Sequence, residues 1–151
     1  MTRRSVWWMA LVLSTASAAG PPLKPEPVTL SGSVVLLAEV LKASGLTYDT
    51  EPIAKQVVLK ADDGTITPIL SDDASRALFL DGRLRRRRIE VQGRRHAGLP
   101  YLQVVSFKVD DHGRLSTPEY FCDVCTISVR FPQICPCCQG EMVLRMRPEP
   151  E

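Results

Sequence analysis

The sequence predicts a mainly β protein with one short helix and a small cysteine-rich β-hairpin near its C-terminal end. Short runs rich in valine, isoleucine and threonine are separated by turn residues, as expected for strands. The turn signal Asp62-Asp63-Gly64 lies between two of these runs and indicates a hairpin. Four cysteines follow the spacing C-x2-C-x9-C-x2-C, which predicts a small domain built around a metal ion.

Residues 1–19 have the pattern of a secretory signal peptide. Arg3 and Arg4 precede an apolar run from Val6 to Leu13, and small residues follow up to Gly20. The run is much shorter than the roughly 20 residues that span a bilayer, so no transmembrane helix is expected in the mature chain. We therefore expect an exported protein, periplasmic or secreted. An uncleaved N-terminal membrane anchor is the alternative, and the paired arginines also fit the twin-arginine route.

The mature chain is predicted to start with a proline-rich linker at residues 20–27. From Val28 to Leu41 the sequence predicts a strand with a bulge at Gly32, although its second half also has a helical period. The runs 56–60 and 65–70 are the expected hairpin. Pro68 places its second strand at a sheet edge, because proline donates no ladder hydrogen bond.

A short helix is predicted next. Ser71 is the expected N-cap, Asp72 and Asp73 suit the positive helix start, and Asp81-Gly82 ends the helix. Two further strands are expected at 85–92 and 101–109.

This order of three strands, a helix and two strands resembles the OB-fold, a five-stranded Greek-key barrel. Arg86 to Gly93 and Tyr101 to Val104 look like its closing strand pair. The resemblance covers residues 28–112 and implies a face that binds a partner protein or an anionic ligand.

The cysteine segment, residues 117–147, resembles a zinc ribbon, especially at the C-P-x-C-x-G motif from Cys135 to Gly140. Strands are expected at 126–131 and 142–145. The resemblance implies that a structural zinc ion is held by four thiolates and that Cys137 points elsewhere. The implied ligands are Cys122, Cys125, Cys135 and Cys138.

Three alternatives to zinc remain. Iron is held in similar rubredoxin-like knuckles, but Thr126 and Gln139 stand where those sites normally carry glycine. Disulfides suit an exported protein, although five cysteines would leave one thiol unpaired. Cys137 beside Cys138 also suits thiol-redox chemistry or metal handling.

Seven arginines lie within residues 83–95. One interpretation is an anion-binding strand; the other is a solvated face that pairs with acidic residues such as Asp72, Asp73, Asp81 and Glu90. The residues proposed for anion binding are Arg86, Arg88, Arg94 and Arg95.

Charge and motifs limit the function. Two of the 19 basic residues and none of the 17 acidic residues lie in the predicted signal, so the mature chain has no net charge. Nucleic acid is therefore not an expected partner, unless the chain is not exported and acts as a nucleic-acid-binding OB protein. No catalytic motif appears, and we expect a non-enzymatic protein. The sequence does not indicate the partner or the oligomeric state.

Overall fold

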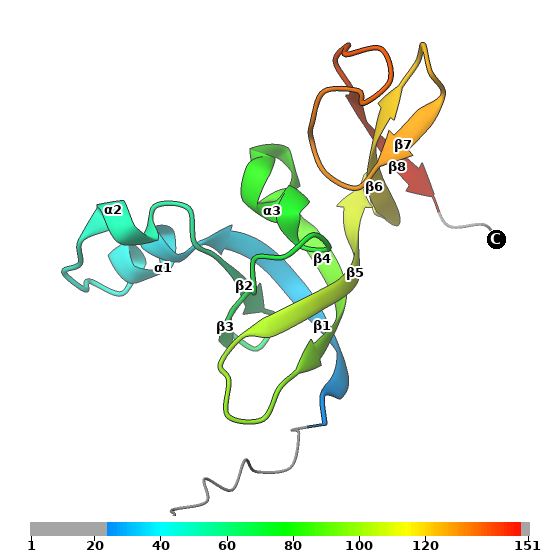
Figure 1. Ribbon diagram of the computed structural model, residues 1–151. Helices are drawn as coiled ribbons and strands as arrows, with labels where there is room; N and C mark the ends of the chain where they lie inside the picture. The colour runs from blue at the N-terminus through cyan, green and yellow to red at the C-terminus, as the bar shows by residue number, and fades with distance from the viewer. Residues whose placement is uncertain (1–23, 149–151) are drawn as a thin grey trace, which may run out of the picture.

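The structure is a computed structural model that describes residues 24–148 (Figure 1). The predicted signal peptide lies outside the described residues. One antiparallel sheet has the strand order β3-β2-β1-β4-β5-β6-β7, with β8 also paired to β6. The strands are β1 (Glu26–Leu36), β2 (Val57–Ala61), β3 (Ile66–Pro68), β4 (Arg88–Arg95), β5 (Leu102–Asp111), β6 (Arg114–Cys122), β7 (Ile127–Val129) and β8 (Val143–Pro148). The helices are α1 (Leu37–Ala43), α2 (Thr50–Ile53), α3 (Arg76–Leu80) and the 3-10 turn η1 (Gly82–Leu84).

The first predicted strand is present, but the bulge predicted at Gly32 is wrong. β1 pairs with β4 in continuous register from Glu26 to Ser33, and with β2 from Gly32 to Leu36. A Cβ atom at Gly32 would lie 2.2 Å from the carbonyl oxygen of Lys60. Gly32 is therefore required where two backbones approach closely, which is the other common reason for glycine in a strand. The second half of the predicted segment is helical, as its period allowed, and forms α1.

The hairpin between β2 and β3 confirms the turn prediction. Gly64 has a left-handed φ of 85°, and the side chain of Asp63 accepts a hydrogen bond from the backbone of Thr65 at 2.8 Å. β3 is the terminal strand of the sheet order, as Pro68 predicted.

The helix starts later than predicted, and Ser71 is not its cap. Ser75 precedes α3 and is fully buried, while Ser71 is exposed. The Ser75 hydroxyl accepts from the backbone N–H of Asp72 and donates to the carbonyl of Leu70 at 2.6 Å, and its own N–H donates to the Asp72 carboxylate. These bonds use the polar groups of residues 70–75 in a compact turn, so the helix begins only after it.

β4 begins three residues later than predicted, because the chain first passes through η1 and a left-handed residue, Arg86, with φ 62°. β4 and β5 then pair along most of their length, with a register shift at Gln92/Gly93. Beyond β3, one parallel bridge joins Ile69 to Leu102, and the N–H of Leu70 donates to the carbonyl of Leu102 at 2.9 Å.

β6 was not predicted from the sequence, and it connects the two parts of the molecule. Its first residues, 114–116, pair with β5, and its last, 120–122, pair with β7. β8 pairs with residues 116–121 of β6. Because Ser116 has partners in both β5 and β8, and Tyr120 in both β7 and β8, β5 and β7 share one edge of β6 and β8 has the other. The C-terminal strands thus extend the main sheet (Figure 1).

The core lies between the strands and α3. Its members come from β1, β2, β4, β5 and β6 and from residues 69–84, and Tyr120 is the largest fully buried side chain among them. The most completely buried are Val34, Val57, Leu59, Leu78, Leu84, Ile89, Val91, Leu102, Val109 and Tyr120.

The predicted mainly β class is confirmed, with a correction to the number of strands. The sequence predicted five strands, one short helix and a separate hairpin, whereas residues 24–148 form eight strands in one open antiparallel sheet, with three short α-helices and one 3-10 turn. The difference arises from β6, which carries backbone hydrogen bonding from the first part into the second.

Candidate metal centre

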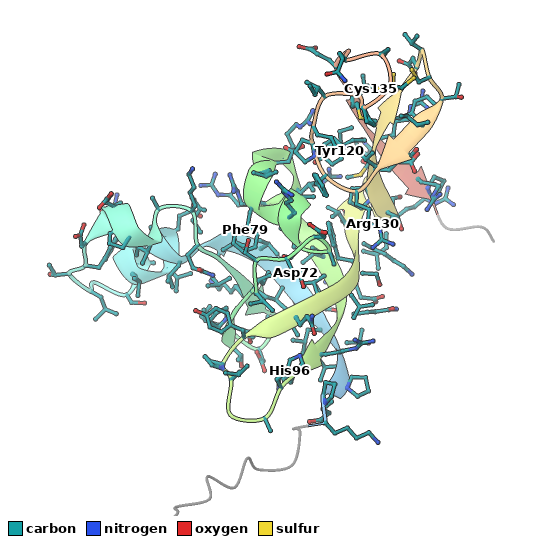
Figure 2. The ribbon with its side chains drawn as sticks, viewed as in Figure 1. Asp72, Phe79, His96, Tyr120, Arg130 and Cys135 are labelled. Atoms are coloured by element: carbon teal, nitrogen blue, oxygen red, sulfur yellow. The ribbon has the colours of Figure 1, made fainter. Side chains whose placement is uncertain are left out.

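Two tight turns, which we call knuckles, carry the four cysteines of the predicted centre. The first contains Cys122 and Cys125, between β6 and β7, and the second contains Cys135 and Cys138, between β7 and β8. Figure 2 labels Cys135 in this C-terminal part of the sheet.

The knuckles have matching backbone geometry. In the first, the N–H of Thr126 donates to the carbonyl of Cys122 at 2.8 Å; in the second, the N–H of Gln139 donates to the carbonyl of Cys135 at 3.0 Å. Thr126 and Gln139 are both left-handed, with φ of 55° and 60°. Rubredoxin-like sites normally carry glycine at these two positions, so the left-handed conformation is kept here although the residue type is not.

The four thiols converge. Their Sγ atoms all lie within 4.8 Å of one another, and those of Cys122 and Cys138 are 3.5 Å apart. Sulfur atoms around a tetrahedral zinc ion lie about 3.8 Å apart, because Zn–S bonds are about 2.3 Å long. Adjustments of about 1 Å would therefore close the cluster around one ion, so the donor set and its spacing fit a four-thiolate metal. All five cysteines are free thiols.

The thiols differ in acidity without a metal. Hydrogen bonds from the backbone N–H groups of Cys138 and Cys137 lower the pKa of Cys135 to about 7. Hydrogen bonding with the thiols of Cys137 and Cys138, together with burial, raises the pKa of Cys125. Cys135 is thus a ready source of thiolate near neutral pH, and thiolate is the form that binds metal.

Cys137 is exposed and lies outside the group of four, although its thiol is close enough to that of Cys125 for hydrogen bonding. Cys138 is also exposed, whereas Cys122 and Cys135 are buried. The centre therefore has two inner thiols and one thiol that reaches the surface beside the fifth cysteine.

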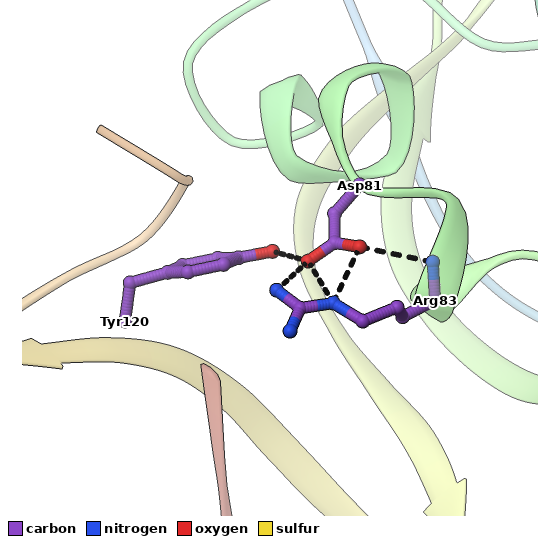
Figure 3. Close-up of polar contacts among 3 residues, drawn as sticks. All are labelled: Asp81, Arg83 and Tyr120. Carbon is purple, nitrogen blue, oxygen red and sulfur yellow. Dashed lines mark hydrogen bonds and ion pairs between the residues drawn. The ribbon is translucent and has the colours of Figure 1, made fainter. Parts of the chain in front are cut away.

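A polar cluster around a buried carboxylate connects the centre to the rest of the sheet. Tyr120, two residues before the first knuckle, donates its hydroxyl to the Asp81 carboxylate at 2.7 Å (Figure 3). Arg83 donates to the same carboxylate from Nε and from Nη2, the latter at 2.6 Å. Asp81 is only 7% exposed. Burial alone would raise its pKa, but the hydrogen bonds from Arg83 and Tyr120 outweigh it and lower the pKa below 3.8.

A second contact joins α3 to the segment between the knuckles. The guanidinium of Arg76 lies over the ring of Phe131, 4.5 Å from its centroid. Phe131 is partly buried against the core. Together with the Asp81 cluster, this contact fixes the C-terminal strands against α3.

The structure shows the surroundings of the four arginines that the sequence proposed for anion binding. Arg86 pairs with Glu39 at 2.5 Å, and Arg88 with Asp62 at 3.5 Å, so both face carboxylates on neighbouring elements. Arg94 and Arg95 lie in β4 opposite Pro27 and Glu26. Among the acidic partners expected for the arginines of residues 83–95, Asp81 pairs with Arg83, whereas Asp73 pairs with Arg76, which lies outside that run.

Sequence reasoning missed Tyr120 and the role of Asp81, which lie 39 residues apart and meet only in the folded chain. The sequence contained one local signal for β6, the dipeptide His112-Gly113, in which glycine favours a tight turn. His112 and Gly113 both have positive φ, 54° and 85°, and form a two-residue hairpin turn between β5 and β6.

Within residues 24–148, no helix has the length and apolar character that crossing a bilayer would require. Comparison of the chain with protein-family models, curated proteins and solved structures finds no match.

Proposed function

We propose that this is an exported, non-enzymatic protein whose four-thiolate centre binds a structural metal ion and thereby fixes a binding surface. The observation that carries the proposal is the convergence of four thiols from two equivalent knuckles. Four thiolates leave no open coordination position on a tetrahedral ion, so the centre is structural. The knuckles have little buried surface of their own, so metal binding contributes much of their folding free energy.

Zinc is the proposed ion. It accepts four thiolates in tetrahedral geometry and has no redox chemistry, which suits a centre partly open to solvent. Iron is the alternative, because left-handed residues after both cysteine pairs also suit its knuckles.

We further propose that β1 to β5 form an OB-like barrel. Three features support this: β1 pairs with both β2 and β4, α3 lies between β3 and β4, and the bridge from Ile69 to Leu102 lies where β3 would meet β5 in such a barrel. OB barrels serve many functions, so this proposal does not name a ligand.

Native mass spectrometry of the protein purified under reducing, chelator-free conditions tests the metal proposal. We expect one metal ion per chain and removal of residues 1–19 from exported protein. Cys122→Ser removes a buried ligand and should abolish stoichiometric binding. Cys137→Ser is the matched control and should retain one ion. Absence of stoichiometric zinc or iron in the wild-type protein would overturn the proposal. An uncleaved, intracellular chain would instead favour the nucleic-acid-binding alternative.

The exposure of Cys137 and Cys138 favours a second function, metal handling or thiol exchange. In that case Cys137 would replace a ligand or form a transient disulfide with its neighbours. Alkylation of the folded, metal-loaded protein, followed by peptide mass spectrometry, separates the two functions. Rapid modification of a ligand cysteine supports metal handling, whereas modification of Cys137 alone supports the structural role.

A further inference from the structure

A groove crosses the junction between the two parts of the sheet, away from the cysteines. Its volume is about 570 Å³, within the usual range of ligand sites. Residues 105–108 of β5 form one wall, and residues 117–119 of β6 and 128–130 at β7 form the other. Neither part of the sheet has this groove on its own.

Positive charge exceeds negative charge in the groove. Lys108, Arg130 and Arg147 line it, with one carboxylate, Glu119. That carboxylate lies 3.8 Å from Arg147. Within residues 24–148, Arg130 is exposed and forms no ion pair, and Figure 2 shows it near the junction of the two parts of the sheet. A bound carboxylate at Arg130 would therefore gain a cation without displacing a protein carboxylate.

The floor of the groove is apolar. Val105 is 45% exposed, and Phe107, Pro118 and Val129 lie beside it in the lining. Val105 has no partner in the β4–β5 register, where Gln92 pairs with Ser106 and Gly93 with Val104. An exposed valine at an irregularity of the strand is a suitable contact for an apolar side chain of a ligand.

The groove continues along the sheet. A second hollow shares Gln92 and Val105 with it and extends to Val28 and Arg94. The second hollow contributes Arg94, the first contributes Lys108, Arg130 and Arg147, and the apolar side chain of Val105 lines both. An extended chain fits this shape better than a compact ligand does.

We propose that this groove binds an extended acidic segment of a partner protein, with carboxylates at Arg130 and Arg147 and an apolar side chain over Val105. The inference deepens the proposed function: it assigns a partner class, and its surface includes Arg94, one of the four arginines proposed for anion binding.

It rests on the metal proposal in one respect. Val129 and Arg130 lie between the two knuckles, so the metal would hold one wall of the groove in place. Removal of the metal should therefore weaken peptide binding even though the groove contains no ligand of the metal.

The test uses the full metal-loaded chain and a fluorescein-labelled ten-residue peptide of alternating glutamate and valine. Fluorescence anisotropy should give saturable binding at physiological salt, and amide shifts in 15N spectra should map to residues 105–108, 117–119 and 128–130. A peptide with lysine in place of glutamate should not bind. A peptide with serine in place of valine should bind about tenfold more weakly, because it lacks the apolar contact.

Two groove variants and one matched control locate the site. Arg130→Glu and Val105→Asp should each weaken peptide binding by about tenfold or more, through charge repulsion and loss of the apolar floor respectively. The control is the double variant Lys42→Glu with Lys55→Glu, which places two charge reversals on the exposed surface of α1 and the loop after α2. It should leave the Kd within about twofold, since these side chains do not line the groove.

The proposal is overturned if the glutamate–valine peptide shows no saturable binding, if its amide shifts map elsewhere, or if the control weakens binding as much as Arg130→Glu. Metal content is measured on the same samples. A metal-loaded protein that does not bind the peptide refutes this inference alone. A metal-free protein that binds the peptide through Arg130 refutes the metal proposal and leaves the groove.

Discussion

Thr126 and Gln139 show how single residues set the shape of the knuckles. Both adopt left-handed φ without being glycine, and Thr126 is also β-branched. A residue with a Cβ atom loses about 1–2 kcal/mol of stability when its backbone is left-handed, and glycine avoids this cost. Part of that advantage is offset, because glycine has more conformational entropy in the unfolded chain. Thr126→Gly should therefore stabilise the metal-loaded protein by about 0.5–1 kcal/mol in urea unfolding, and Gln139→Gly by a similar amount. Thr126→Ala is the control and should give no such gain. Equal stability of the glycine and alanine variants would contradict this account.

Asp81 gives the protein a defined sensitivity to acid. Its folded-state pKa lies below the ordinary value of 3.8, so its contribution to stability is complete above about pH 5 and is lost as pH falls through the folded pKa. Asp81→Asn replaces one of the carboxylate oxygens, which accept hydrogen bonds, with an amide NH2 group, which donates them. The substitution should lower the free energy of unfolding by about 1.5–3 kcal/mol at pH 7. The difference in stability between the two proteins should shrink below pH 4.

Thermal unfolding of both proteins across pH 3–7 measures this difference. Acid also releases metal from thiolates, but that loss affects both proteins and cancels in the comparison. A difference that stays constant down to pH 3 would show that Asp81 does not titrate as proposed.

Gly32 has its effect at the scale of the elements, because it allows β1 to pass from β4 to β2. A Cβ atom there would lie within 3 Å of three backbone atoms of β2. Gly32→Ala should therefore displace one strand and destabilise the protein by about 1–3 kcal/mol or more. Gly82→Ala is a matched control, since its Cβ would meet only the flexible end of Arg85 at 3.1 Å. Similar melting temperatures for the two variants would rule out the close approach as the reason for Gly32.

Local patterns in the sequence predicted the elements that local chemistry defines. The Asp62-Asp63-Gly64 turn gave the β2–β3 hairpin, and the cysteine spacing gave the two knuckles. The position of α3 was wrong because Ser75, rather than Ser71, forms the hydrogen bonds before the helix. β6 was missed because Ser116 and Pro118, both buried, interrupt its apolar pattern. Pairs such as Asp81 with Tyr120 depend on tertiary packing between residues that are far apart in the sequence, so local patterns do not predict them.

At the scale of the whole molecule, metal removal should affect the two parts of the sheet unequally. The core of the first part does not depend on the cysteines, whereas the knuckles join β6, β7 and β8. A chelator under reducing conditions should increase amide hydrogen exchange at residues 123–142 by at least about tenfold, with little change in β1 and β2. Cys137→Ser should respond as the wild type does. Uniform loss of protection across all strands would show that the metal holds the entire fold.

The sharing of β6 also determines how this chain can acquire its structure during synthesis. β5 completes its outer pairing only after residues 114–116 are made, and β6 completes its own only with β8. The Asp81 carboxylate lacks one of its hydrogen-bond donors until Tyr120 has been synthesised. After about the first hundred residues have left the ribosome, the sheet still has an open edge and the Asp81 carboxylate is still partly solvated. Both are completed only when about the last thirty residues have been made. A holding chaperone, or a pause before release, would be of most use to this protein in that interval.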